Sequence, residues 1–106
     1  MSGPTVWKLT EVASLDGDRL LVLQGELDIV TAPELDAILT RMHEHAHPVV
    51  LDLEGITFMD STGLTTLMDH WLRAEQDGRP FSVRAASRSV RRVVGLAGVD
   101  RLLDGA

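Results

Sequence analysis

Apolar residues recur every three or four positions in three stretches of the chain, the spacing of a helix with one buried face. The positions are Leu35, Ile38, Leu39 and Met42 in the first stretch, Leu64, Leu67, Met68, Trp71 and Leu72 in the second, and Val90, Val93, Val94 and Ala97 in the third. Polar residues suited to a helix N-terminus precede each stretch. We therefore predict three amphipathic helices.

The helix boundaries follow from capping residues. Thr31 and Glu34 have the spacing of a capping box, and Pro33 suits the first turn of the first helix. The second helix opens at Asp60-Ser61-Thr62-Gly63 and ends near Asp77-Gly78, with Pro80 beyond as a stop. The third starts near Ser87.

Strand-like runs separate these helices. Asp16-Gly17-Asp18 joins the first two runs and is a hairpin signal, so these two strands should be antiparallel. Strands and helices then alternate, which predicts parallel strands joined by right-handed crossovers. The tail from Asp100 to Ala106 is expected to form a short edge strand or to fray. The four predicted strands are Val6 to Ala13, Arg19 to Gln24, Pro48 to Leu53, and Phe81 to Ala85.

The predicted fold is a single α/β domain over residues 1–106, a length that suits one core. Its mixed sheet has four to five strands, the first antiparallel and the remainder parallel, with the helices mainly on one face. The net charge of −6 argues against nucleic acid or an anionic membrane as a partner. There is no cysteine, membrane-spanning run or signal peptide, so we expect a soluble cytoplasmic protein.

The candidate site lies where two predicted parallel strands end. Gly25-Glu26-Leu27-Asp28 follows the second strand, and Gly55 to Asp60 follows the third. Because the carboxyl ends of parallel strands share one edge of a sheet, Asp28 should lie near Asp60 and Ser61. Phe58 and Met59 would be partly exposed in the second loop or buried under the second helix, and burial is favoured for Phe58.

Ser61 is predicted to sit at a helix N-terminus, where backbone N–H groups and the helix dipole favour anions. Simple capping by Asp60 and Ser61 is the alternative interpretation. Gly63 costs about 1 kcal/mol relative to alanine in a helix, and we expect it to leave open backbone beside the serine.

Catalysis by Ser61 lacks support, because a nucleophilic serine needs a positioned base. His43, His45 and His47 are expected at the opposite rim of the sheet, and His70 lies more than two helical turns further along the helix of Ser61. No G-x-S-x-G motif occurs. We therefore predict no enzymatic activity and interpret Ser61 as a residue that is acted upon.

Two clusters remain. His43 and His47 could share a helix face as metal ligands, but Pro48 ends that helix at once, and we favour solvated histidines. No metal or cofactor is predicted. For the basic cluster we favour a solvated outer face of the third helix over a contact patch for an acidic partner. That cluster is Arg84, Arg88, Arg91 and Arg92.

The run LDLEGITFMDSTGL, preceded by GELD, resembles the STAS domain, and within it the stand-alone bacterial anti-sigma factor antagonists. The resemblance covers almost the whole chain, although many members carry a further strand and helix. It implies a partner switch. The antagonist binds an anti-sigma factor that is also a serine kinase and so frees the sigma factor. The kinase phosphorylates Ser61, the complex separates, and a serine phosphatase restores the antagonist.

The resemblance also assigns a contact surface. Asp28 and Asp60 match acidic positions associated with partner contact or with orienting the serine, and Thr62 is a second candidate acceptor. A scaffold or an accessory subunit of a signalling assembly or transporter, without a phosphorylation switch, is the alternative. The predicted partner-binding residues are Asp28, Met59, Asp60, Ser61, Thr62 and Gly63.

Overall fold

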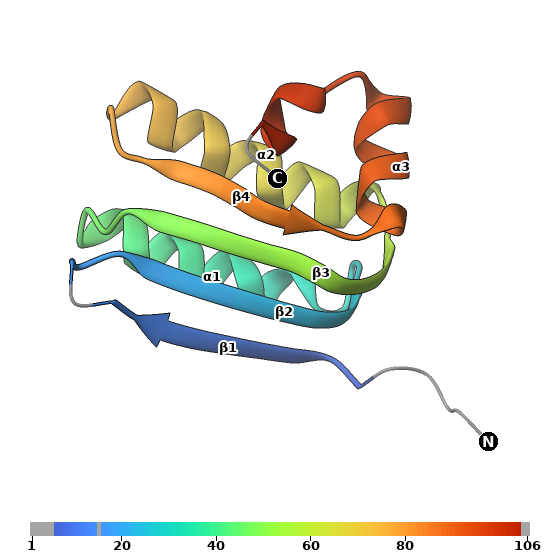
Figure 1. Ribbon diagram of the computed structural model, residues 1–106, viewed down its shortest axis with the longest axis horizontal. Coiled ribbons are helices and arrows are strands. Elements are labelled where there is room, and N and C mark those ends of the chain that lie inside the picture. The colour runs from blue at the N-terminus through green and yellow to red at the C-terminus, as the bar shows by residue number, and fades with distance from the viewer. Residues whose placement is uncertain (1–5, 15, 105–106) are drawn as a thin grey trace.

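The computed structural model describes residues 6–14 and 16–104, and the predictions for residues 1–5, 15 and 105–106 lie outside this part. The strand order is β1-β2-β3-β4, with β1 antiparallel to β2 and the other pairs parallel. The predicted mixed sheet is therefore confirmed, with four strands among the described residues (Figure 1). The elements are β1 (Lys8–Ala13), β2 (Arg19–Leu27), α1 (Ala32–Glu44), β3 (Val49–Met59), α2 (Ser61–Gln76), β4 (Phe81–Ala86), α3 (Arg88–Ala97) and the 3-10 helix η1 (Asp100–Leu103).

The predicted hairpin joins β1 to β2. Ala13 pairs with Arg19, and the Ser14 amide donates to the Asp18 carbonyl at 3.0 Å. Gly17 has φ +89°, a left-handed conformation that glycine adopts without a Cβ clash. The turn thus reverses the chain where the sequence placed the Asp-Gly signal.

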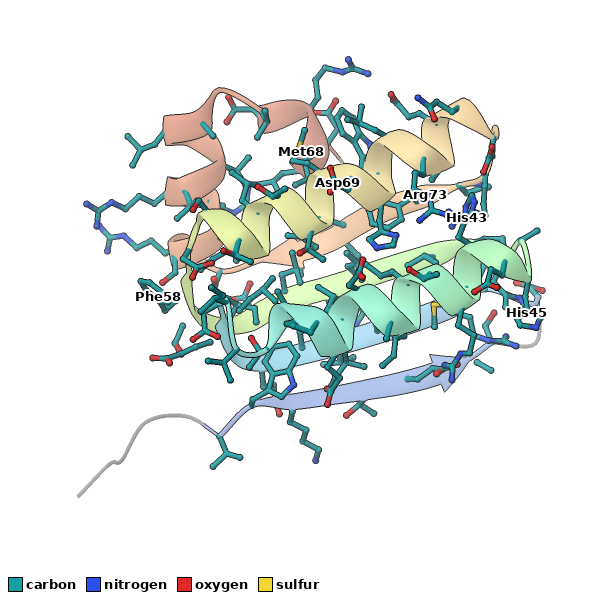
Figure 2. All side chains as sticks on the ribbon, turned by 180° about the vertical axis from the view of Figure 1, so that it is seen from behind. His43, His45, Phe58, Met68, Asp69 and Arg73 are labelled. Atoms are coloured by element: carbon teal, nitrogen blue, oxygen red, sulfur yellow. The ribbon has the colours of Figure 1, made fainter. Side chains whose placement is uncertain are left out.

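Helices α1 and α2 lie side by side against one face of the sheet, as Figure 1 and the opposite view in Figure 2 show. Leucine side chains of β2 and β3 point into this layer and are fully buried, among them Leu21, Leu23 and Leu51. The other face carries polar groups, including an ion pair of Arg84 with Asp52 at 3.2 Å. Helices mainly on one face are therefore confirmed. In the described residues, no helix has the length and apolar character needed to cross a bilayer.

Both central strands run further than predicted. β2 continues through Leu27 and β3 through Met59, so the predicted loops over residues 25–27 and 55–59 are wrong. The reason is pairing: Gly25 lies opposite Ile56, and Leu27 lies opposite Met59. Three of these side chains are buried, so the hydrophobic core extends to the very end of the two strands.

Helix α3 lies beside the carboxyl half of β3. β4 pairs with β3 only as far as Leu53 opposite Ala86. Beyond that point the Ser89 hydroxyl of α3 donates to the Thr57 carbonyl of β3 at 2.8 Å. The chain then forms η1, whose Leu102 is buried in the core, so the expected edge strand or frayed end is wrong for Asp100–Leu103.

The buried faces of two helices differ from the predicted stripes. Leu72 of α2 and Ala97 of α3 are exposed, whereas His70 of α2 is buried with 2% of its surface exposed. The His70 Nε2 atom lies 2.7 Å from the Asp36 Oδ1 atom of α1, so a polar pair links the two helices. The buried positions of α2 are Gly63, Leu67, His70 and Ala74.

Candidate functional site

Asp60 joins the two segments of the predicted site. It directly follows β3 in an extended conformation and caps α2, because its Oδ1 atom accepts the Gly63 amide at 2.9 Å. Its Oδ2 atom accepts the Ile29 amide from the β2–α1 loop at 3.2 Å. One carboxylate therefore holds the start of α2 against the loop that carries Asp28. The prediction that these segments share one rim is confirmed.

Asp28 shapes its own loop. Its Oδ1 atom accepts the amides of Val30 at 2.9 Å and Thr31 at 3.1 Å. The Asp28 carbonyl accepts the Ala32 amide at 2.8 Å. The aspartate thus supplies the carboxylate that stabilises the entry to α1, and it stays half-buried in doing so.

The predicted capping box of Thr31 and Glu34 is wrong. Thr31 forms no side-chain cap bond; its hydroxyl accepts the Asp28 amide at 3.0 Å and donates to the Glu26 carbonyl at 2.7 Å. Glu34 accepts from the Trp7 indole N–H at 2.8 Å. The Thr31 hydroxyl is therefore used within the β2–α1 loop, and the Glu34 carboxylate by a residue distant in sequence.

Ser61 is the first residue of α2 and is exposed. Across residues 6–14 and 16–104, its hydroxyl has no hydrogen-bond partner, and the amides of Ser61 and Thr62 have no acceptor. The two amides and the positive end of the helix dipole therefore remain unpaired within the described part of the chain, beside the exposed hydroxyl. This end of α2 can receive an anion. Thr62 is half-buried next to it.

Two predicted contact residues are buried instead. A Cβ atom on Gly63 would lie 2.5 Å from the Leu27 carbonyl oxygen, so the absence of a side chain lets α2 pack on the end of β2. The expectation of open backbone at Gly63 is therefore wrong. Met59 is 3% exposed, whereas Phe58 is 49% exposed, which reverses the favoured burial. Strand alternation explains this, since neighbouring residues of β3 point to opposite faces.

The rim also carries exposed apolar side chains that the sequence analysis did not assign to the site. Ile29 is 69% exposed and Val30 is 80% exposed, and Phe58 lies at the same end of the sheet. In the sequence, Ile29 and Val30 follow Asp28 without fitting the helix periodicity, which was the available signal. Contiguous exposed apolar residues are typical of interaction sites.

His43, His45 and His47 lie at the other end of the sheet. Figure 2 shows His43 and His45 far from Phe58. The His43 Nδ1 atom is 3.0 Å from the Arg79 Nη2 atom and 3.2 Å from the Asp77 carboxylate, whereas His47 contacts Arg19. Burial lowers the pKa of the Arg79 guanidinium. Among the described residues, no group of three or more His, Cys, Asp or Glu residues could hold a metal ion.

Known proteins share this fold and sequence pattern. The family model described as "Mlab, STAS domain" matches residues 10–104. An anti-sigma-B factor antagonist of Staphylococcus epidermidis is 31% identical over 80 residues, which is 74% of each chain. This relative is named as an antagonist of another protein rather than as an enzyme.

Solved structures agree. An anti-sigma factor antagonist from Mycobacterium paratuberculosis has a TM-score of 0.75 and 28% identity, covering 97% of this chain and 87% of its own. The Bacillus cell fate determinant SpoIIAA in its phosphorylated form has the same fold, with a TM-score of 0.74 and 18% identity over 91% of this chain and 88% of its own. The chain therefore belongs to the STAS domain family.

Proposed function

We propose that this chain is an anti-sigma factor antagonist whose binding is switched off by phosphorylation of Ser61. The observation that carries the proposal is the exposed Ser61 hydroxyl, without a hydrogen-bond partner among the described residues, on a rim of exposed apolar side chains. In this proposal the rim binds an anti-sigma factor, which is also the serine kinase, and a serine phosphatase reverses the modification.

The position of Ser61 suits a phosphoryl acceptor. A kinase would join the Ser61 Oγ atom to the γ-phosphorus of ATP, break the bond to ADP, and remove the hydroxyl proton. Asp60 is the nearest carboxylate in sequence, but both its oxygens accept backbone amides, from Gly63 and Ile29. We therefore assign the base to the kinase. This agrees with a site that is acted upon.

The same position suits a charge switch. A phosphoryl group adds roughly −1.5 to −2 charges. The helix N-terminus tolerates this charge, since the amides of Ser61 and Thr62 have no acceptor among residues 6–14 and 16–104. A partner that packs on Ile29, Val30 and Phe58 would have to bury it, and misplaced charge at an interface costs several kcal/mol. The fold would survive modification while the complex would not.

The relatives support both halves of the proposal. The staphylococcal relative is named an anti-sigma-B factor antagonist, and SpoIIAA has been solved in a phosphorylated form. Asp28 and Asp60 contribute by fixing the loop and the helix start that present the rim. Met59 and Gly63 contribute indirectly, because they are buried and pack beneath the rim.

A phosphorylation assay tests the acceptor. Each kinase-like anti-sigma factor of the organism that makes this chain is purified and incubated with the chain and ATP, and the product is measured by intact mass. We expect one phosphoryl group, lost in Ser61→Ala and kept in Thr62→Val. Loss of the phosphoryl group in Thr62→Val, with retention in Ser61→Ala, would identify Thr62 as the acceptor instead. Phosphorylation by none of these factors would contradict the proposed switch.

A further inference from the structure

A groove lies between the carboxyl end of β3 and α3, with a volume of about 390 Å³. Phe58 and Met59 line its β3 side, and Arg92, Val93 and Leu96 line its α3 side. The bond from the Ser89 hydroxyl to the Thr57 carbonyl holds the two sides together. We call this feature the α3 groove.

The α3 groove exists because α3 has two apolar stripes. Val90 and Val94 are fully buried in the core. Val93 and Leu96 form a second, smaller apolar surface on α3 that lines the groove, and Arg92 lies beside them. Leu96 is 80% exposed and lacks a covering element among the described residues, whereas Val93 is half-buried against the core. A second apolar stripe on a short helix is typical of a docking surface.

The positive charge of α3 favours an acidic binding partner for the groove. The chain has a net charge of −6, yet α3 contains Arg88, Arg91 and Arg92 and no acidic residue. Arg91 donates to the Ala86 carbonyl at 3.2 Å. Arg92 lines the groove and has no ion-pair partner among residues 6–14 and 16–104. Its planar guanidinium is therefore available to pair with a carboxylate in two parallel bonds.

The α3 groove is continuous with the rim of Ser61. Phe58 and Met59 line the groove, and the chain then passes through Asp60 directly to Ser61. Figure 1 shows α3 at the end of the sheet where β3 leads into α2. Phe58 therefore belongs both to the rim and to the lining of the groove, which places the two surfaces next to each other.

We propose that the α3 groove receives a segment of the anti-sigma partner in which a large apolar side chain stands next to a carboxylate. The apolar side chain packs against Val93 and Leu96, and the carboxylate pairs with Arg92. This inference rests on the proposed function for the identity of the partner. It adds a second anchor that phosphorylation does not touch and that selects partners by their acidic segment.

Calorimetric titration of the purified anti-sigma factor that binds the unmodified chain tests the groove. Arg92→Glu should weaken binding by about ten- to a hundredfold through charge repulsion, and Leu96→Ala by about tenfold. Arg88→Glu makes the same charge change on the same helix outside the groove, and Leu72→Ala removes an exposed leucine of α2. Both controls should stay within about threefold of wild type.

Several outcomes would overturn the proposal. Wild-type affinity in Arg92→Glu and Leu96→Ala, with binding still lost in Ser61→Glu, would refute the groove and leave the proposed function standing. Equal losses of affinity in Arg92→Glu and Arg88→Glu would show that the effect comes from long-range charge and not from the groove. If the wild-type chain is a dimer and Leu96→Ala is a monomer, the groove binds a second copy of the chain instead. If no anti-sigma factor binds the wild-type chain, both proposals fail together.

Discussion

Gly63→Ala is expected to lower the free energy of unfolding by about 3 kcal/mol, near the upper end of the usual cost of overpacking. The new Cβ atom would lie 2.5 Å from the Leu27 carbonyl oxygen and 2.8 Å from the Leu27 Cγ atom. The carbonyl oxygen is a backbone atom and cannot move without shifting the end of β2. Thermal and urea unfolding of the two proteins measures the difference.

Gly95→Ala is the matched control. Gly95 lies inside α3, and the nearest atom to its added Cβ is the Asp100 carboxylate oxygen at 3.8 Å. The helix propensity of alanine should raise the stability by about 0.5–1 kcal/mol. Equal stability of Gly63→Ala and wild type would show that α2 does not depend on close approach to β2.

Ser61→Glu is expected to weaken binding of the anti-sigma factor by about a hundredfold, which corresponds to 2.7 kcal/mol. The reason is a negative charge added to the rim that carries Ile29, Val30 and Phe58, where the partner would bury it without a counter-charge. Ser61→Ala adds no charge and should bind about as tightly as wild type. Affinities from calorimetry at one salt concentration give the comparison.

Gln76→Glu makes the same change in net charge at the far, exposed end of α2. It should leave the affinity unchanged within about twofold, since exposed charges beyond a Debye length are screened. A comparable loss in Ser61→Glu and Gln76→Glu would assign the effect to overall charge, and the local account of the rim would be wrong.

The order and type of the elements were predictable because their signals are local. Asp16-Gly17 marks the hairpin, and Asp60 and Ser87 cap the helices at which the sequence placed them. The alternation of strands and helices then limits the parallel part of the sheet to few topologies. Because the carboxyl ends of parallel strands share one edge of a sheet, the sequence alone also predicted that Asp28 lies near Asp60.

The ends of the strands were not predictable, because they depend on neighbours distant in sequence. Leu27 and Met59 continue their strands only because they pair with each other over the core. Their pairing decides which of Phe58 and Met59 is exposed. A one-residue change in strand phase exchanges these two faces, which is why the favoured burial of Phe58 was wrong.

Side-chain partners across the fold were hidden for the same reason. Glu34 has the spacing of a capping residue, but its carboxylate accepts a hydrogen bond from the indole of Trp7, which directly precedes β1. His70 is polar, yet it takes a buried position in α2 because Asp36 of α1 lies 2.7 Å away. In each case a tertiary contact outweighs the local preference.

The most direct test of the central claim uses phosphoserine itself at position 61. The chain carrying it is titrated with the same anti-sigma factor as the unmodified chain, and thermal unfolding is recorded for both. We predict at least about a hundredfold weaker binding, as for a loss of 2.7 kcal/mol, with the unfolding midpoint nearly unchanged. Equal affinity of the two forms, or a loss of binding that follows unfolding of the modified chain, would contradict the account.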